Sequence, residues 1–394
     1  MSSKSNRLYF IDAIRAWAIL MMLQGHFIDG LLDNAFRDNS SIIFSIWKYF
    51  RGITAPVFFT VSGFIFTYLL INAKENGWKN PRVKKGIRRG FELVLIGYLL
   101  RLNLFGLFMG EIYSSFFLVD VLHCIGLSIL GIISVYLLTA NQQKWILPTV
   151  LVSVTISLFV FEPLYKEVGF HLLPQWLANY FTKINGSVFT ILPWFGYAVF
   201  GSFFSVVFNK YKTHNLFYPS IMALCVILGT LFIFYSSDGF LLFSQYTGIS
   251  LFESIFYNNY LFIRLGDVLL VFALFMIFRK FLTNKTILRL GQSTLSIYII
   301  HFILLYGSFT GLGLYGFFNH SLPPTIVIPG ALVFMIVCSY LALRYEDNKI
   351  TIKLKVKNIL KIVMVKIEYV LLFAFNALRS LSLKIAKLFG LIKN

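Results

Sequence analysis

The chain has 394 residues, of which 58% are hydrophobic and only 13% are charged, and its mean hydropathy is +0.77. Soluble domains carry about 25% charged residues, so this composition excludes a soluble protein of ordinary type. The net charge of +19 would suit a nucleic-acid partner, but the basic residues gather between long apolar runs, as in cytoplasmic loops. We therefore predict an all-α polytopic membrane protein without a nucleic-acid partner. Long unbroken runs argue against an outer-membrane barrel, whose strands alternate.

Apolar runs of roughly 18–24 residues predict about ten transmembrane helices. They cover residues 13–33, 52–72, 90–108, 115–138, 146–162, 187–208, 216–236, 258–278, 290–309 and 324–343. The first run has no small-residue cleavage site after it, so we expect it to stay in the mature protein. The three cysteines each lie within an apolar run, so we expect no disulfide and no metal site.

The basic connections predict the orientation of these helices. Residues 74–89 contain seven Lys and Arg, which places this connection in the cytoplasm by the positive-inside rule. Alternation then places the N-terminus, with Lys4 and Arg7, and the C-terminal tail on the same side. The sequence therefore predicts a protein of the cytoplasmic (inner) membrane with both termini in the cytoplasm.

The C-terminal tail, residues 344–394, differs from the rest of the chain. It contains eleven Lys and Arg against three acidic residues, and its apolar and basic residues alternate at nearly helical spacing. This pattern predicts a basic amphipathic helix lying on the anionic inner leaflet of the membrane. An alternative is that residues 362–378, which are strongly apolar, form an eleventh span.

The first predicted helix carries polar residues in the stretch LMMLQGHFIDGLL (20–32), namely Gln24, His26 and Asp29. Ionisable side chains in hydrocarbon are costly and usually face a cavity, a partner or a substrate. His26 and Asp29 share a helix face, so the carboxylate could orient the imidazole for acid–base chemistry. The simpler alternative is that His26 bonds to a neighbouring helix for packing.

Other ionisable residues also fall in or beside apolar runs. They are Arg101, Asp120, His123, Arg264, Asp267 and His301. Asp120 and His123 are three residues apart at a predicted depth similar to that of His26, which predicts one shared polar cavity. Arg264 and Asp267, with the same spacing, are expected to form an ion pair. We find no metal-ligand spacing, no phosphate-binding Gly loop and no Gly-x-Ser-x-Gly motif. These features alone fit a transferase and a proton-coupled transporter equally well.

Five segments, in this order, carry a resemblance to a known family. The first, RLYFIDAIRAWAILMMLQGH (7–26), has the form Arg-x4-Asp-x2-Arg-x10-His. The others are ITAPVFFTVSGFIFTYLL (53–70), VDVLHCIGLSIL (119–130), LPWFGYAVFG (192–201) and LGQSTLSIYIIH (290–301). Together they resemble the transmembrane acyl transferase superfamily, in its heparan-α-glucosaminide N-acetyltransferase-like branch and the bacterial relatives of that branch.

The resemblance implies a membrane acyltransferase, formed by residues 1–343, that moves an acyl group from cytoplasmic acyl-CoA to a glycan or glycolipid. Either a hydroxyl or an amine could accept the group, and we favour O-acetylation. The family uses a membrane-embedded His, which in the animal enzyme lies in the segment after the first helix, whereas residues 27–56 of this chain contain no His. The resemblance to the broader acyltransferase superfamily implies that His26 takes this role, as base or acyl carrier. Asp29 would orient His26, and Asp120 and His123 would line the acceptor side.

Acetyl-CoA or another acyl-CoA is the expected co-substrate, with no metal. Its phosphates would meet Arg15, Arg82, Lys84, Lys85, Arg88 and Arg89. The alternative is that the basic loop serves only as a topology signal. We expect Gln24, Arg101 and His301 to contact substrate. The expected partners are membrane lipid, the glycan or glycolipid acceptor, and a second copy of the chain in a homodimer. The alternatives are a transporter or lipid/glycan translocase that uses the same cavity, and a scaffold subunit whose tail recruits partners.

Overall fold

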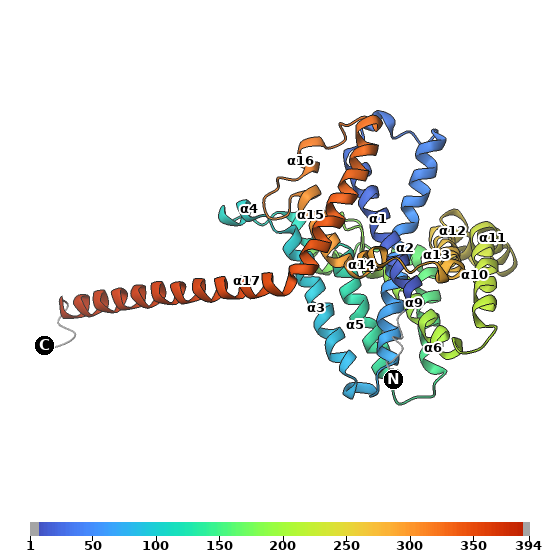
Figure 1. Ribbon diagram of the computed structural model, residues 1–394, viewed down its shortest axis with the longest axis horizontal. Coiled ribbons are helices and arrows are strands. Elements are labelled where there is room, and N and C mark those ends of the chain that lie inside the picture. The colour runs from blue at the N-terminus through green and yellow to red at the C-terminus, as the bar shows by residue number, and fades with distance from the viewer. Residues whose placement is uncertain (1–7, 389–394) are drawn as a thin grey trace. The chain divides into compact units, whose positions relative to one another are not determined.

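The computed structural model describes residues 8–388, and within that range the regular elements are helices. The α-helices are α1 (Tyr9–Leu31), α2 (Ile42–Ile71), α3 (Pro81–Arg101), α4 (Leu104–Phe108), α5 (Val121–Thr139), α6 (Ile146–Val160), α7 (Glu162–Tyr165), α8 (Gln175–Ala178), α9 (Ile191–Tyr211), α10 (Phe217–Phe234), α11 (Ser236–Thr247), α12 (Ser250–Tyr257), α13 (Tyr260–Ile277), α14 (Lys285–Gln292), α15 (Thr294–Tyr306), α16 (Leu314–Phe318) and α17 (Pro324–Leu388). In Figure 1, α3 lies beside α5, and α10 lies beside α13.

The predicted all-α membrane fold is confirmed. In the described part of the chain, seven helices are long and apolar enough to cross a membrane, or eight if the bent pair α14 and α15 is one span. The predicted number of ten is not confirmed, although each predicted segment overlaps a helix. α6 has only 15 residues, and α3 carries many charged residues over its first half, so neither passes as a span by length and composition.

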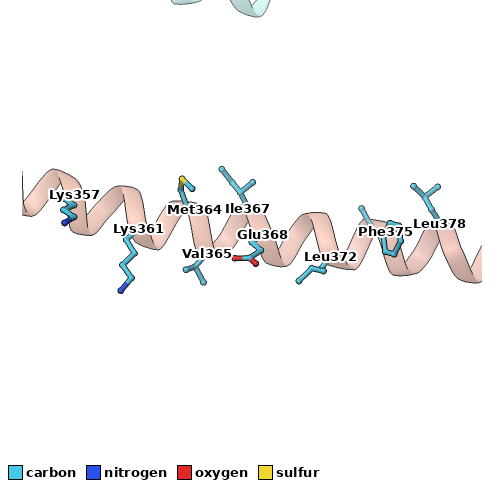
Figure 2. A pocket seen from close by; sticks show the side chains of 10 residues that line it. Lys357, Lys361, Met364, Val365, Ile367, Glu368, Leu372, Phe375 and Leu378 are labelled. Carbon is cyan, nitrogen blue, oxygen red and sulfur yellow. The ribbon is translucent and has the colours of Figure 1, made fainter. Parts of the chain in front are cut away.

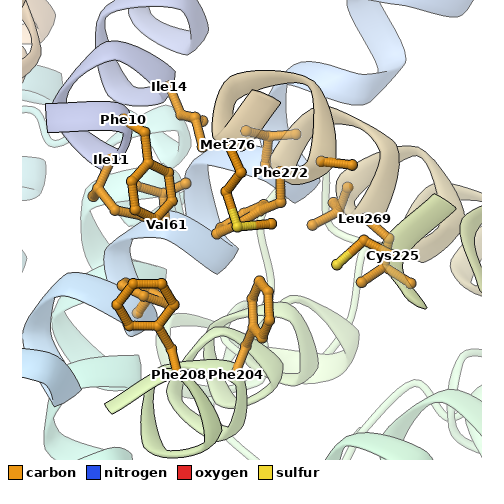
Figure 3. Packing of buried hydrophobic residues seen from close by; sticks show 14 of the residues in the cluster. Phe10, Ile11, Ile14, Val61, Phe204, Phe208, Cys225, Leu269, Phe272 and Met276 are labelled. Atoms are coloured by element: carbon orange, nitrogen blue, oxygen red, sulfur yellow. The ribbon is translucent and has the colours of Figure 1, made fainter. Parts of the chain in front are cut away.

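The core of the bundle is formed by aromatic and aliphatic side chains from α1, α2, α9, α10 and α13 (Figure 3). Phe64 of α2 is central to it, because its ring lies 5.6–5.9 Å from the rings of Phe204, Phe208 and Phe272. Lipid tails are as apolar as these side chains, so close van der Waals packing rather than the hydrophobic effect holds membrane helices together.

Two glycines bring α2 and α9 into backbone contact. A Cβ atom added at Gly63 would lie 1.9 Å from the carbonyl oxygen of Ala198, and one added at Gly201 would lie 1.9 Å from that of Thr60. No other residue fits at such a separation, and small residues at helix contacts are typical of membrane bundles. This contact fixes α2, whose N-terminal half contributes side chains to the candidate site.

The structure corrects the predicted ninth span, residues 290–309. The helix is interrupted after Gln292, and the axes of α14 and α15 differ by 71°. At the break, Gly291 lies so close to α1 that an added Cβ would be 1.9 Å from the carbonyl oxygen of Asp12. A straight helix could not make this contact and also direct α15 towards the C-terminal half of α1, where His26 lies. The second predicted span also begins earlier, at Ile42, so that Arg51 lies inside a helix.

Residues 343–394 form a unit separate from residues 1–342. Every described side chain from Ile350 to Leu383 is exposed. Figure 2 shows part of this helix, where Met364 and Ile367 point to one side and Lys361 and Leu372 to the other. Apolar side chains therefore occupy more than one side of the helix.

We expect the tail to bind anionic membrane. In nanodiscs of neutral lipid, trypsin should cut after Lys366 readily, whereas anionic lipid should protect this site in low salt and lose that effect in high salt. Cleavage after Lys166, an exposed residue that follows α7, is the control and should be the same in both lipids. Protection at Lys366 in neutral lipid would indicate a spanning helix, and cleavage that is equal in both lipids would contradict membrane binding.

Candidate active site

His26 of α1 lies where two cavities meet. One cavity has a volume of about 380 Å³ and the other about 480 Å³. Both are lined by His26, by Arg51 of α2, and by Val188 and Phe189 from the segment that precedes α9. A group held in either cavity therefore has access to the same imidazole and the same guanidinium group.

The smaller cavity is mainly apolar and aromatic. The indole of Trp194 lies 5.4 Å from the ring of Phe59 and 5.0 Å from that of Phe189, measured between centroids. The other lining residues include Met21, Met22, Phe58, Val121 and Tyr260, and the cations Lys48, Arg51 and Arg264. A pocket with aromatic walls and a few polar groups is typical of sites for partly apolar ligands.

The larger cavity is more polar, and ion pairs line it. Arg101 donates two hydrogen bonds to the carboxylate of Asp120, at 2.5 and 2.7 Å. Across the cavity, Arg51 donates to the carboxylate of Asp29 at 2.6 Å. The remaining polar residues in its lining include Asn103, Tyr113, Ser115, Tyr298, Tyr306 and Ser308. Hydroxyl, amide and paired charged groups of this kind suit a ligand that carries several hydroxyls.

The structure gives His26 a different partner from the one that its spacing suggests. Nδ1 of His26 lies 3.1 Å from Nε2 of His301, on α15. The carboxylate of Asp29, which we expected to orient His26, accepts from Arg37 at 2.7 Å and from Arg51 at 2.6 Å instead. Both arginines follow α1 in the chain and fold back against its end, and helical spacing within α1 contains no information about them.

Asp120 and His123, which were expected to share one cavity, lie in different surroundings. Asp120 precedes α5 as its N-cap rather than lying within it, and His123 at the third helical position completes a capping box. Nδ1 of His123 accepts a hydrogen bond from the backbone N–H of Asp120 at 3.1 Å. His123 is fully buried with its ring 4.4 Å from that of Tyr98, and it lines neither cavity, whereas Asp120 lines the polar one.

The other polar residues of the predicted site lie as follows. The side-chain oxygen of Gln24 accepts from the indole N–H of Trp47 at 2.9 Å, and Gln24 lines neither cavity. Arg264 and Asp267 form the predicted ion pair at 2.8 Å. Tyr49 donates to the same carboxylate at 2.7 Å, so the charge of Asp267 is well compensated.

The basic residues expected to meet acyl-CoA do not form one cluster. Arg15 donates to the hydroxyl of Thr294 at 3.0 Å and lies 3.7 Å from the carboxylate of Asp12. Arg82 lines a third cavity, of about 750 Å³, together with Asp12 and Lys74. This cavity lies at the end of α1 opposite to His26. Fourteen residues of helix separate Asp12 from His26, a rise of about 20 Å.

The rest of that basic segment is at the surface. Lys84 and Lys85 are exposed. Arg88 donates to Glu92 at 2.7 Å, and Arg89 lies 3.9 Å from the same carboxylate. These positions are accessible to the phosphates of a soluble ligand, and they equally suit a cytoplasmic loop.

Sequence reasoning missed several residues that line the site or support it, chiefly Arg37, Arg51, Tyr298 and Tyr306. One signal was present for the arginines. Positive charges between the first two spans are unusual for a loop assigned to the outer side, so a specific partner such as Asp29 should have been sought. The tyrosines carried no such signal among the 21 of the chain.

Within residues 8–388, no three His, Cys, Asp or Glu side chains lie together as a metal site would require.

Comparison with known proteins identifies the family. The model of the family described as heparan-alpha-glucosaminide N-acetyltransferase, catalytic, matches residues 7–238, which is more than half of the chain. No curated protein matches. The matched range contains His26, Asp29, Arg51, Arg101 and Asp120, but neither α13 nor α15. The resemblance seen in the sequence is thereby confirmed, and this chain belongs to the heparan-alpha-glucosaminide N-acetyltransferase catalytic family of membrane acetyltransferases.

Proposed function

We propose that this protein moves an acetyl or other acyl group from acyl-CoA to a hydroxyl or amine of a cell-surface glycan or glycolipid. The observation that carries this proposal is the position of His26 at the junction of an aromatic cavity and a polar cavity. A transferase must bring two chemically different substrates to one base, and this arrangement provides for that. Membership of an acetyltransferase family supports the same reading.

The two cavities suit the two substrates. The aromatic cavity beside Trp194 would hold the acyl thioester and the adjoining part of its arm, which are largely apolar. The polar cavity beside Asp120 and Arg101 would hold the acceptor, because a sugar presents many hydroxyl groups. Arg51 lines both cavities and could donate to the carbonyl oxygen as negative charge develops on it.

The reaction then needs one base. Since His301 occupies Nδ1 of His26, Nε2 is the nitrogen available to substrate. Nε2 would take the proton from the acceptor O–H or N–H while that oxygen or nitrogen attacks the thioester carbonyl carbon. The C–S bond then breaks, and the departing CoA thiolate takes the proton back from His26. In an acyl-carrier variant, Nε2 itself attacks the thioester carbonyl carbon, and the C–S bond breaks with CoA leaving as the thiolate. The acceptor oxygen or nitrogen then attacks the acyl-imidazole, the bond from the acyl carbon to Nε2 breaks, and the acceptor proton passes to the CoA thiolate.

We further propose the cytoplasmic (inner) membrane as location, with both termini in the cytoplasm. The basic residues of 74–89 support this orientation. Acyl-CoA would approach from the end of α1 that carries Asp12 and Arg15, where Arg82 lines a cavity. His26 would then lie in the outer half of the membrane, on the side where a cell-surface glycan is found.

The test is binding and turnover of labelled acetyl-CoA by the purified protein in detergent. The wild type should bind acetyl-CoA and release CoA slowly without an acceptor. His26→Ala should still bind, with turnover lower by about 10²- to 10⁴-fold, which is the usual contribution of a general base. His171→Ala is the matched control, because His171 is exposed and lines neither cavity, and it should behave as wild type.

Two outcomes would contradict the proposal. One is that wild type fails to bind acetyl-CoA at millimolar concentration. The other is that His26→Ala turns it over at the wild-type rate. A transporter or translocase would instead show flux of a lipid or glycan across proteoliposomes in the absence of CoA, and that flux would depend on the same cavities.

A further inference from the structure

His301 of α15 contacts His26 of α1. Its side chain is fully buried, and it lines neither cavity, so it has no direct access to substrate. It also lies on α15, beyond the range 7–238 that matches the acetyltransferase family. Any role of His301 in the reaction therefore acts through its contact with His26.

The contact between the two imidazoles has two possible arrangements. Nδ1 of His26 and Nε2 of His301 are 3.1 Å apart, which is a hydrogen-bond distance with one proton between them. If the proton is on His26, then Nε2 of His26 has a free lone pair and can act as a base. If the proton is on His301, neutral His26 carries its own proton on Nε2 and can only donate to substrate.

The proposed function requires the first arrangement, because His26 can act as a base at Nε2 only when its own proton is on Nδ1. Nε2 of His301 lies 3.1 Å from that nitrogen and must then accept the proton. Nδ1 of His301 is buried and has no hydrogen-bond partner in the described part of the chain, so the contact with His26 is the one that fixes the pair. With the proton on Nδ1, neutral His301 can only accept at Nε2. The rings of Tyr298 and Phe302, at 4.8 and 5.8 Å between centroids, hold the imidazole in place.

We propose that His301 is a positioning residue that holds His26 in the tautomer with Nε2 free and directed at substrate. This inference rests on the proposed function, because it assumes that His26 acts as the base. It replaces the Asp–His pair expected from the sequence with a His–His pair formed between two helices that are far apart in the chain. A neutral partner of this kind orients the base without adding a negative charge inside the membrane.

Two substitutions of similar polarity test this role. In His301→Gln the amide oxygen lies three bonds from Cβ, as Nε2 does in histidine, and can still accept from His26. In His301→Asn the amide lies only two bonds from Cβ, as Nδ1 does, and cannot reach His26. We expect Asn to lower kcat on the order of 100-fold with the KM for acetyl-CoA nearly unchanged. Gln should retain a rate within about tenfold of wild type.

The outcomes separate this inference from the proposed function. Both variants are first compared with wild type for acetyl-CoA binding and thermal unfolding in detergent, so that loss of fold is recognised. If His26→Ala is inactive and His301→Asn matches wild type, the positioning role is wrong and the function stands. If His301→Asn and His301→Gln lose kcat equally while both stay folded, the hydrogen bond that residue 301 accepts from His26 does not control the rate. The inference is then also wrong. If His26→Ala is fully active, the proposed function fails first.

Discussion

Adding one methyl group at Gly63 is expected to destabilise the membrane bundle by about 3 kcal/mol, near the upper end of the usual range for overpacking. The new Cβ would lie 1.9 Å from the carbonyl oxygen of Ala198, so α2 and α9 would have to separate along their contact. A backbone atom cannot rotate away as a side chain can. The separation would also disturb Phe64, which lies one residue further along α2 in the centre of the core.

This expectation is tested by thermal unfolding of purified Gly63→Ala in detergent. The midpoint should fall by roughly 5 °C or more. Gly239→Ala is the matched control, since a Cβ at Gly239 of α11 meets no atom within 4 Å, and its midpoint should not fall. If the two variants have equal midpoints, the close contact between α2 and α9 is absent in the protein.

The second large effect is expected from Arg101→Ala. The two hydrogen bonds from Arg101 neutralise the carboxylate of Asp120, and the two side chains are only 18% and 13% exposed. Removal of one partner of a largely buried ion pair leaves an uncompensated charge and typically costs about 3 kcal/mol or more. Because both residues line the polar cavity, acceptor modification should fall as well.

A double substitution separates this charge effect from simple loss of contacts. In Arg101→Ala combined with Asp120→Asn, no charge is left unpaired, and Asn still caps α5 well. The thermal midpoint of the double variant should therefore exceed that of Arg101→Ala alone. Arg88→Ala provides the comparison for stability, because Arg88 is 83% exposed in its pair with Glu92 and should contribute less than about 1 kcal/mol. Equal midpoints for the single and double variants would contradict the coupling.

The helical segments follow closely from the sequence because the membrane makes local composition decisive. A run of apolar residues must satisfy its own backbone hydrogen bonds in lipid, and a helix does so without help from distant residues. Each predicted run therefore overlaps a helix. One departure from the predicted spans occurs where a tertiary contact intervenes. The break after Gln292 accompanies the contact of Gly291 with the carbonyl of Asp12, a residue almost 280 positions earlier.

The residues of the candidate site also depend partly on local sequence and partly on tertiary contacts. The sequence alone singled out His26, Asp29, Arg101 and Asp120, which line the polar cavity, because an ionisable residue in an apolar run is conspicuous wherever its partners lie. It also singled out Gln24, His123 and His301, which line neither cavity. Motifs that are local in the chain also pointed to an acetyltransferase family, and the match of the family over residues 7–238 confirms this.

Only the tertiary structure decided which of these residues pair. Spacing along one helix suggested that Asp29 would orient His26, but Arg37 and Arg51 bind Asp29, and His301 takes its place from another helix. The two cavities likewise combine residues from α1, α2, α13, α15 and the connections between them. Composition sets which residues are costly to bury in a membrane, whereas the partner that compensates each of them depends on how the helices pack.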